Sequence, residues 1–183
     1  MSSIRMTILL LIIAPLMLSF SFFKSKKPRD YEDMANEISA KVAKKLAKKH
    51  HMDWIGEGGG MMDSVNMIAL SFRIHHPLDR DEARKRIIDC VEELLAAVNA
   101  NEEIRPFLKN YPFTTENVQV AIFSELADGG KVFDPYITVV SVDESNYITF
   151  RTKEPNKVLY KHRHHELYSE ARAMLKGNVR KEK

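Results

Sequence analysis

The sequence is poor in cysteine: its 183 residues include one, Cys90. No disulfide can form within the chain, so an oxidising compartment would have to be tolerated without covalent cross-links. A lipoprotein-type anchor needs a cysteine directly after an apolar leader, and none stands there. Cys90 lies at the edge of an apolar helical stripe with no histidine or glycine-rich turn beside it. This setting predicts a half-buried structural thiol and not a nucleophile.

An excess of charge of one sign is also lacking. The chain has 28 Lys and Arg against 25 Asp and Glu, a formal net charge of +3. Loss of residues 1–23 would remove Arg5 and leave 27 minus 25, or +2. So small a balance predicts no nucleic-acid partner. Hydrophobic residues make up 44% and charged residues 29%, which indicates a single folded domain, expected over residues 30–176, with a frayed basic tail at 177–183.

Familiar catalytic motifs are missing as well. The sequence contains neither the His-Glu-x-x-His pair of helical zinc sites nor the Gly-x-Ser-x-Gly turn of a serine nucleophile. Four of the seven glycines lie within Gly56–Gly60, but a helix is expected before them and a strand after them. A phosphate-binding loop needs the opposite order. This stretch is therefore predicted to be a flexible connector, and no cofactor is predicted.

What the sequence does have is one long apolar run, from Met6 to Phe23. Residues 1–23 are typical of a signal peptide or an uncleaved signal anchor, expected as an apolar helix. The run has 18 residues, slightly fewer than the roughly 20 that span a bilayer core. The segment Ser19–Ser21 offers the small residues that cleavage would need, although only weakly.

A basic linker follows the run at residues 24–29, with Lys24, Lys26, Lys27 and Arg29 in a membrane-proximal position. By the positive-inside rule, an uncleaved anchor would hold the domain on the cytoplasmic side, with the membrane as a partner. A cleaved or translocated chain would place the domain in the periplasm or outside the cell. The position of the run at the N-terminus, and its shortness, favour export.

Periodicity predicts an α+β fold. A four-residue apolar repeat indicates a helix over Asp30–His51, and Asp79 with Glu82 can cap a second helix over Leu78–Asn99. Alternation indicates strands over 65–76, 118–122, 136–142 and 147–152, and a last helix is expected over Tyr160–Lys176. The expected architecture is a small, mainly antiparallel sheet of about four strands with a β-α-β-β-β core. The helices would pack on one face.

The seven histidines occur in three groups: His50 and His51, His75 and His76, and His162 with His164 and His165. Imidazole is a common metal ligand, and zinc takes three or four ligands. On a helix, His164 would face the core, whereas His162 and His165 would share the polar side. The candidate metal ligands are therefore His162, His165 and, from a strand end, His75.

Aromatic residues flank prolines and turns in the second half of the chain, namely Tyr111, Phe113, Phe133 and Tyr136. They could form an exposed patch for a protein partner or close the edge of the core. An outer strand could also accept a partner strand. Together with the N-terminal run, these features predict an exported or membrane-tethered envelope domain that acts by protein binding. The alternative is a histidine-dependent hydrolase, with or without a metal.

Overall fold

The computed structural model describes residues 30–181, with side chains omitted at 162–163 and 176–181. The elements, in chain order, are α2 (Tyr31–His50), β1 (Asp53–Gly60), β2 (Met67–Ile74), α3 (Arg80–Ala100), η2 (Arg105–Phe107), η3 (Thr115–Asn117), β3 (Val118–Ser124), β4 (Val139–Val142), β5 (Tyr147–Lys153), β6 (Tyr160–Leu167) and α4 (Tyr168–Lys181). The predicted apolar helix at 1–23 and the linker with Lys24, Lys26, Lys27 and Arg29 lie outside the described residues.

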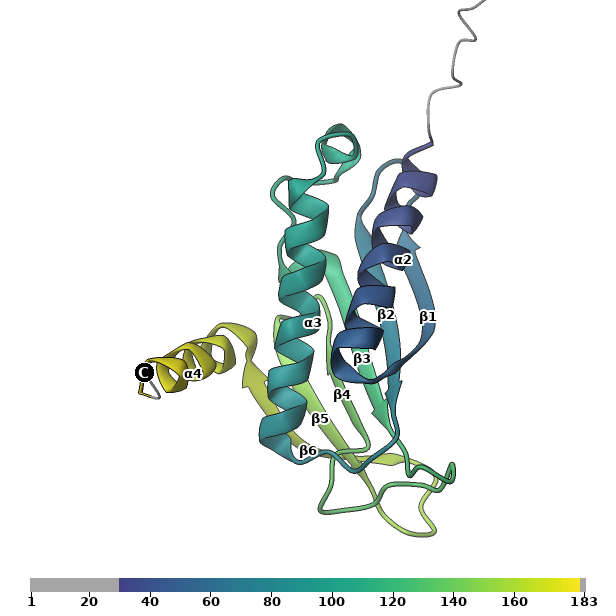
Figure 1. The fold of residues 1–183 in the computed structure, drawn as a ribbon, viewed down its shortest axis with the longest axis vertical. Helices are drawn as coiled ribbons and strands as arrows, with labels where there is room; N and C mark the ends of the chain where they lie inside the picture. The colour runs from purple at the N-terminus through teal and green to yellow at the C-terminus, as the bar shows by residue number, and fades with distance from the viewer. Residues whose placement is uncertain (1–29, 182–183) are drawn as a thin grey trace, which may run out of the picture.

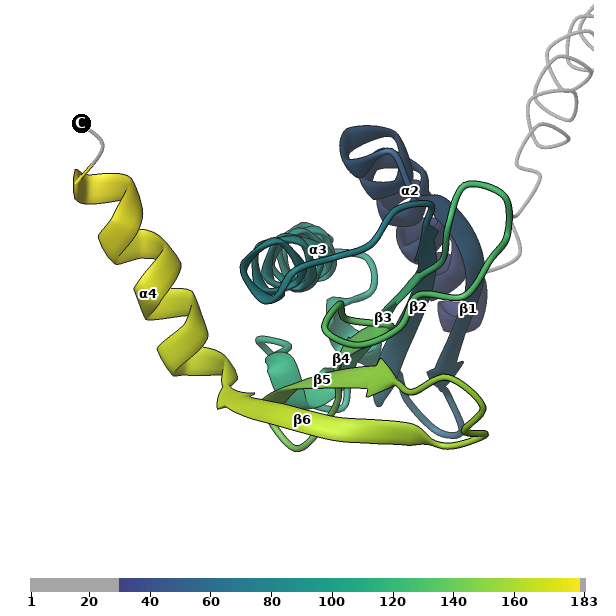
Figure 2. The same cartoon turned by 90° about the horizontal axis from the view of Figure 1, so that it is seen from below.

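The strands form one mixed sheet in the order β1-β2-β3-β4-β5-β6. Strands β2 and β3 are parallel, and α3 makes the crossover between them, whereas every other pair is antiparallel. Helices α2 and α3 lie side by side on one face, and α4 projects away from the body of the domain (Figures 1 and 2). The predicted α+β class is confirmed.

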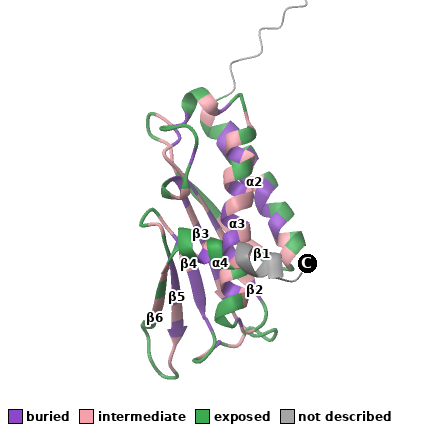
Figure 3. Cartoon of the chain, turned by 90° about the vertical axis from the view of Figure 1, so that its left-hand side faces the viewer, coloured by how far each residue is buried: buried purple, intermediate pink, exposed green. Residues whose placement is uncertain are grey.

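The two covering helices begin as their sequences predict. The Asp30 side chain accepts a hydrogen bond from the Glu32 amide, and Asp79 accepts one from the Glu82 amide at 2.8 Å. Each cap satisfies an amide that the helix cannot pair internally. Buried stripes then face the sheet, through Met34, Ile38, Val42 and Leu46 on α2 and through Ala83, Ile87, Val91, Leu94 and Val98 on α3 (Figure 3).

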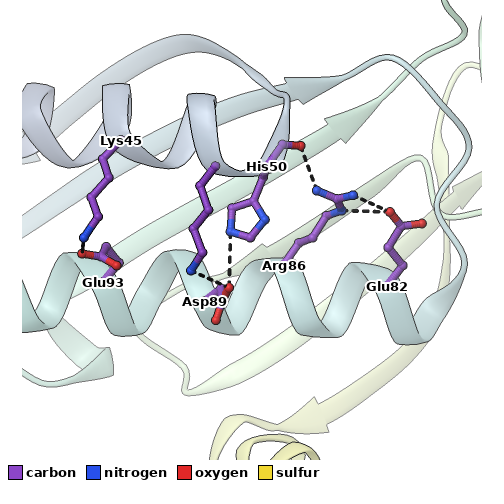
Figure 4. Close-up of polar contacts among 7 residues, drawn as sticks. Lys45, His50, Glu82, Arg86, Asp89 and Glu93 are labelled. Carbon is purple, nitrogen blue, oxygen red and sulfur yellow. Dashed lines mark hydrogen bonds and ion pairs between the residues drawn. The ribbon is translucent and has the colours of Figure 1, made fainter.

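Ion pairs close the outer side of the seam between α2 and α3 (Figure 4). Lys45 pairs with Glu93, and Lys49 contacts Asp89 at 2.9 Å. The Arg86 guanidinium donates to the His50 carbonyl at 2.9 Å and so satisfies a carbonyl at the C-terminal end of α2. Polar contacts therefore fix the C-terminal half of α2 against α3.

The sheet has two more strands than predicted. Gly56–Gly60 is not a connector, because it forms most of β1 and pairs with Met67–Ser71 of β2. Glycine weakens a strand, but α2 packs over β1, and the Ser39 hydroxyl donates to Glu57 at 2.8 Å. Tertiary contacts therefore override the local preference of these residues.

The predicted helix over Tyr160–Lys176 is wrong in its first half. Residues Tyr160–Leu167 form β6, which pairs along Tyr147–Lys153 of β5, and the helix begins only at Tyr168. Glu166 explains part of this choice, because as a strand residue it faces α3 and accepts hydrogen bonds from Arg84 at 2.5 and 2.6 Å. The pairing of β6 with β5 and the Arg84–Glu166 ion pair both join residues far apart in the sequence. The local hydrophobic periodicity therefore cannot predict them.

Candidate functional site

One face of the sheet is not covered by α2 or α3, and we call it the open face. Along β2 and β3 its residues alternate with the buried ones, whereas Val139 on β4 and Thr149 on β5 lie on this face and are themselves buried. Cross-strand register sorts this face into rows, since directly paired residues lie side by side. Two of these rows extend across most of the sheet and differ in chemistry.

The first row is made of small and hydroxyl-bearing residues. In order across the strands, it contains Gly56, Ser71, Ala121, Ser141, Thr149 and His165. No long side chain rises from this row before His165, which stands on the edge strand β6. Because these side chains are short, the row forms a shallow strip across the open face. A hollow of about 270 Å³ lies over part of this strip.

The second row carries charge and an aromatic ring. Its members are Asp53, Arg73, Phe123, Val139 and Arg151. Arg73 and Arg151 stand on β2 and β5, which places their backbones about 14 Å apart at the usual strand spacing. Phe123 lies half-buried between them. The row presents two guanidinium groups on either side of an apolar floor.

A larger hollow of about 410 Å³ continues beyond this row, toward the ends of β3 and β5. Arg73, Phe123, Lys131, Lys153 and Tyr160 are among its lining residues. The Lys153 ammonium lies 5.7 Å from the centre of the Tyr160 ring, within reach of a cation–π contact. The hollow is therefore both basic and aromatic.

The charges of the open face are only partly neutralised. Arg73 lies 3.4 Å from Glu125, which also contacts His75. Within the part of the chain that the structure describes, Arg151 makes no ion pair, and its guanidinium donates to the Ser141 hydroxyl at 3.2 Å. Lys153 likewise has no carboxylate partner among the described side chains. These two cations are therefore available to an acidic ligand.

The three predicted metal ligands do not come together. His75 follows β2, whereas His162 and His165 belong to β6. Strands β3, β4 and β5 lie between β2 and β6, so the backbones of β2 and β6 are about 19 Å apart. His165 contacts Thr149 at 3.2 Å and the Tyr147 ring edge-on, and the side chain of His162 is not described. Among residues 30–181, no group of three His, Cys, Asp or Glu side chains is arranged to hold a metal ion.

His75 is held between two carboxylates. Its Nε2 lies 2.7 Å from Asp53, and its Nδ1 lies 3.1 Å from Glu125. A histidine that acts as a general base needs one ring nitrogen directed at the substrate, but here both nitrogens have protein partners. The geometry therefore favours a structural link between the ends of three strands.

The four predicted aromatic residues do not form one patch. Phe113 is 3% exposed and belongs to the core, and Tyr111 lies beside Asn99 near the C-terminal end of α3. Tyr136 precedes Ile137, which pairs with Leu78 before the start of α3. The 21-residue helix between these ends is about 30 Å long. Tyr136 is exposed and Phe133 is half-buried, but they lie at the opposite end from Tyr111.

The residues of this candidate site that sequence reasoning missed are Arg73, Phe123, Arg151 and Lys153. A signal for Phe123 was present, because it occupies the solvent-facing phase of β3, where Gln119 and Ala121 precede it. A large apolar residue at such a position leaves ring surface uncovered, and it can indicate a binding site.

Comparisons with known proteins identify no relative: no protein family, no curated protein and no solved structure matches the chain. Over residues 30–181, none of the helices has the length and apolar character that crossing a membrane requires.

Proposed function

We propose that the protein is an exported or membrane-tethered domain of the cell envelope that acts by binding a protein partner through its open face. The observation that carries the proposal is the row in which Arg73 and Arg151 flank Phe123. Arginine and aromatic side chains are enriched in protein interfaces, where they act as anchors. The small residues of the neighbouring row would allow close approach of a partner backbone.

The charge of the open face indicates the chemistry of the partner. Arg151 and Lys153 have no carboxylate partner among the described residues, and Lys131 lines the same hollow as Lys153. An acidic, extended segment laid across the strands could pair with these cations while an apolar side chain packs on Phe123. Guanidinium groups bind carboxylates in a bidentate manner, which would favour an acidic protein segment over a neutral one.

A photocrosslinker tests the binding face. Benzoylphenylalanine introduced at Phe123 should give a discrete protein adduct in cells, whereas the same residue at the exposed Lys48 on α2 should not. The paired change Arg73→Glu and Arg151→Glu should remove the adduct. The paired change Lys44→Glu and Lys48→Glu, equal in charge but on the helix side, should leave it. If neither pair of substitutions changes the amount of adduct, the open face is not the binding face.

Location has a separate test. Mass spectrometry of the native protein should find a chain that begins near Ser19–Ser21 if the leader is cleaved, and an intact N-terminus if it anchors the domain. Protease added to the outer side should then digest an exported domain. A domain that resists protease in spheroplasts, whose outer membrane has been removed, but not in lysed cells would contradict export.

A further inference from the structure

The connection between β5 and β6, residues 154–159, carries unusually exposed apolar side chains. Val158 is 88% exposed and Leu159 is 82% exposed, and Tyr160 follows at 47%. Single exposed apolar residues are ordinary on soluble proteins. Two adjacent aliphatic residues and a tyrosine at the end of a hairpin instead present a small apolar point that the rest of the described chain does not cover.

Basic residues surround this point. Positions 153–161 hold Lys153, Lys157 and Lys161 against one acid, Glu154, which gives 3 minus 1, or +2. Lys161 pairs with Glu154 at 2.7 Å. Lys157 makes no ion pair with any side chain that the structure describes. We call residues 153–161 the hairpin tip.

The geometry points to a lipid surface as the ligand of the hairpin tip. We propose that Val158 and Leu159 insert into the interface of an anionic bilayer while the lysines contact lipid phosphates. Apolar residues flanked by Lys and Arg bind such surfaces by combining apolar burial with electrostatic attraction, and tyrosine is enriched at the headgroup level. The inference rests on the membrane location in the proposed function. Lys153 and Tyr160 also line the hollow of the open face, whereas the inserting residues Val158 and Leu159 do not.

A lipid contact at the hairpin tip would fix the orientation of the domain on the membrane. Figure 1 places the start of α2 at one end of the long axis and the hairpin tip at the other. A chain held by its N-terminal segment and by the hairpin tip must therefore lie along the bilayer. A chain held by the N-terminal segment alone could stand upright, with the exposed Met62, near the start of α2, closest to the lipid.

Site-specific fluorescence on the full chain tests the proposal. The environment-sensitive fluorophore NBD can be attached to Val158→Cys without removing Cys90, because Cys90 is fully buried. Vesicles that contain phosphatidylglycerol should shift its emission to the blue, and brominated lipids should quench it. Vesicles of phosphatidylcholine alone should give a smaller shift. The matched control is Met174→Cys on α4, where the native side chain is 55% exposed and where no shift is expected.

The outcomes separate the two proposals. If the chain floats with the vesicles but the label at position 158 stays in water, the hairpin tip does not bind lipid and the membrane tether stands. If a label at Met62→Cys shifts while the one at 158 does not, the domain stands upright, which also overturns the proposal. If the chain does not float with the vesicles, both the tether and the lipid contact of the tip are refuted.

Discussion

His50 is a histidine whose burial sets a pH dependence. Burial lowers its pKa below the usual 6.5, and the charge of Asp89, 3.4 Å away, offsets only part of this effect. The unfolded chain then binds a proton more readily than the folded chain does. Stability from His50 is therefore complete above pH 6.5 and is lost as pH falls from 6.5 through the folded pKa.

The His50→Gln variant should lack this loss. Urea unfolding followed from about pH 8 to about pH 5 should show stability falling in the wild-type chain and changing less in the variant. The control is His51→Gln, at the neighbouring exposed position, which should behave like the wild type. If the free energy of unfolding falls equally with pH in the wild type and in His50→Gln, burial of His50 does not cause the pH dependence.

At the scale of elements, one buried ion pair attaches β6 to α3. Arg84 and Glu166 form two hydrogen bonds, and their side chains are 12% and 9% exposed. Burial by itself would raise the pKa of the Glu166 carboxyl, but the hydrogen bonds and charge of Arg84, with a smaller effect of His164, hold it below 4.5. The pair therefore stabilises the fold above pH 4.5, and its contribution disappears as pH falls below that value.

We expect Glu166→Gln to lower the free energy of unfolding by about 2 kcal/mol at neutral pH, since it removes the buried carboxylate charge beside Arg84 and leaves the guanidinium paired only with the exposed Asp81. The difference from the wild type should shrink as pH falls below 4.5. Glu170→Gln, at an exposed position on α4, should change stability little. Chemical denaturation at neutral and acidic pH gives the free energy of unfolding of the wild type and both variants. If Glu166→Gln is as stable as the wild type, the Arg84–Glu166 pair does not stabilise β6.

The glycines of β1 differ according to the face they occupy. A Cβ at Gly59 would come within 2.8 Å of the Met67 carbonyl, whereas a Cβ at Gly58 would meet only Ala69 at 3.9 Å. Gly59→Ala should therefore destabilise the fold by about 1 kcal/mol or more. Gly58→Ala should be neutral or stabilise it by roughly 0.5 kcal/mol, because glycine loses more entropy in a strand. Thermal unfolding of the two variants compares them directly, and equal effects would contradict the pairing of β1.

Local patterns predicted the elements whose stability is local. The apolar stripes of α2 and α3, the Asp79 cap of α3, and the alternation of β2 and β3 are visible in short windows of sequence. Strands β1 and β6 are not, because a glycine run and a histidine-rich segment become strands only through pairing with β2 and β5. The candidate site was missed for the same reason. Arg73, Phe123 and Arg151 are far apart in sequence, and only the register of the sheet aligns them.

At the scale of the whole molecule, the proposed function combines two features of different origin. The N-terminal run predicts a location at or beyond the membrane, and the open face supplies a surface for a partner. The structure describes only the second of these. A partner bound in the cell should cover the open face and leave the surface of α4 free, which gives the account its most direct test.

That test is the reactivity of single cysteines in cells compared with the purified chain. Ser71→Cys is nearly isosteric and lies between Arg73 and the glycines of β1, and Ser169→Cys is an exposed control on α4. Burial raises the pKa of the Cys90 thiol to about 12, so the native cysteine should not react. A membrane-permeant maleimide should label both variants in the purified chain, but only Ser169→Cys in cells. Equal labelling of Ser71→Cys in cells and in the purified chain would contradict a partner on the open face.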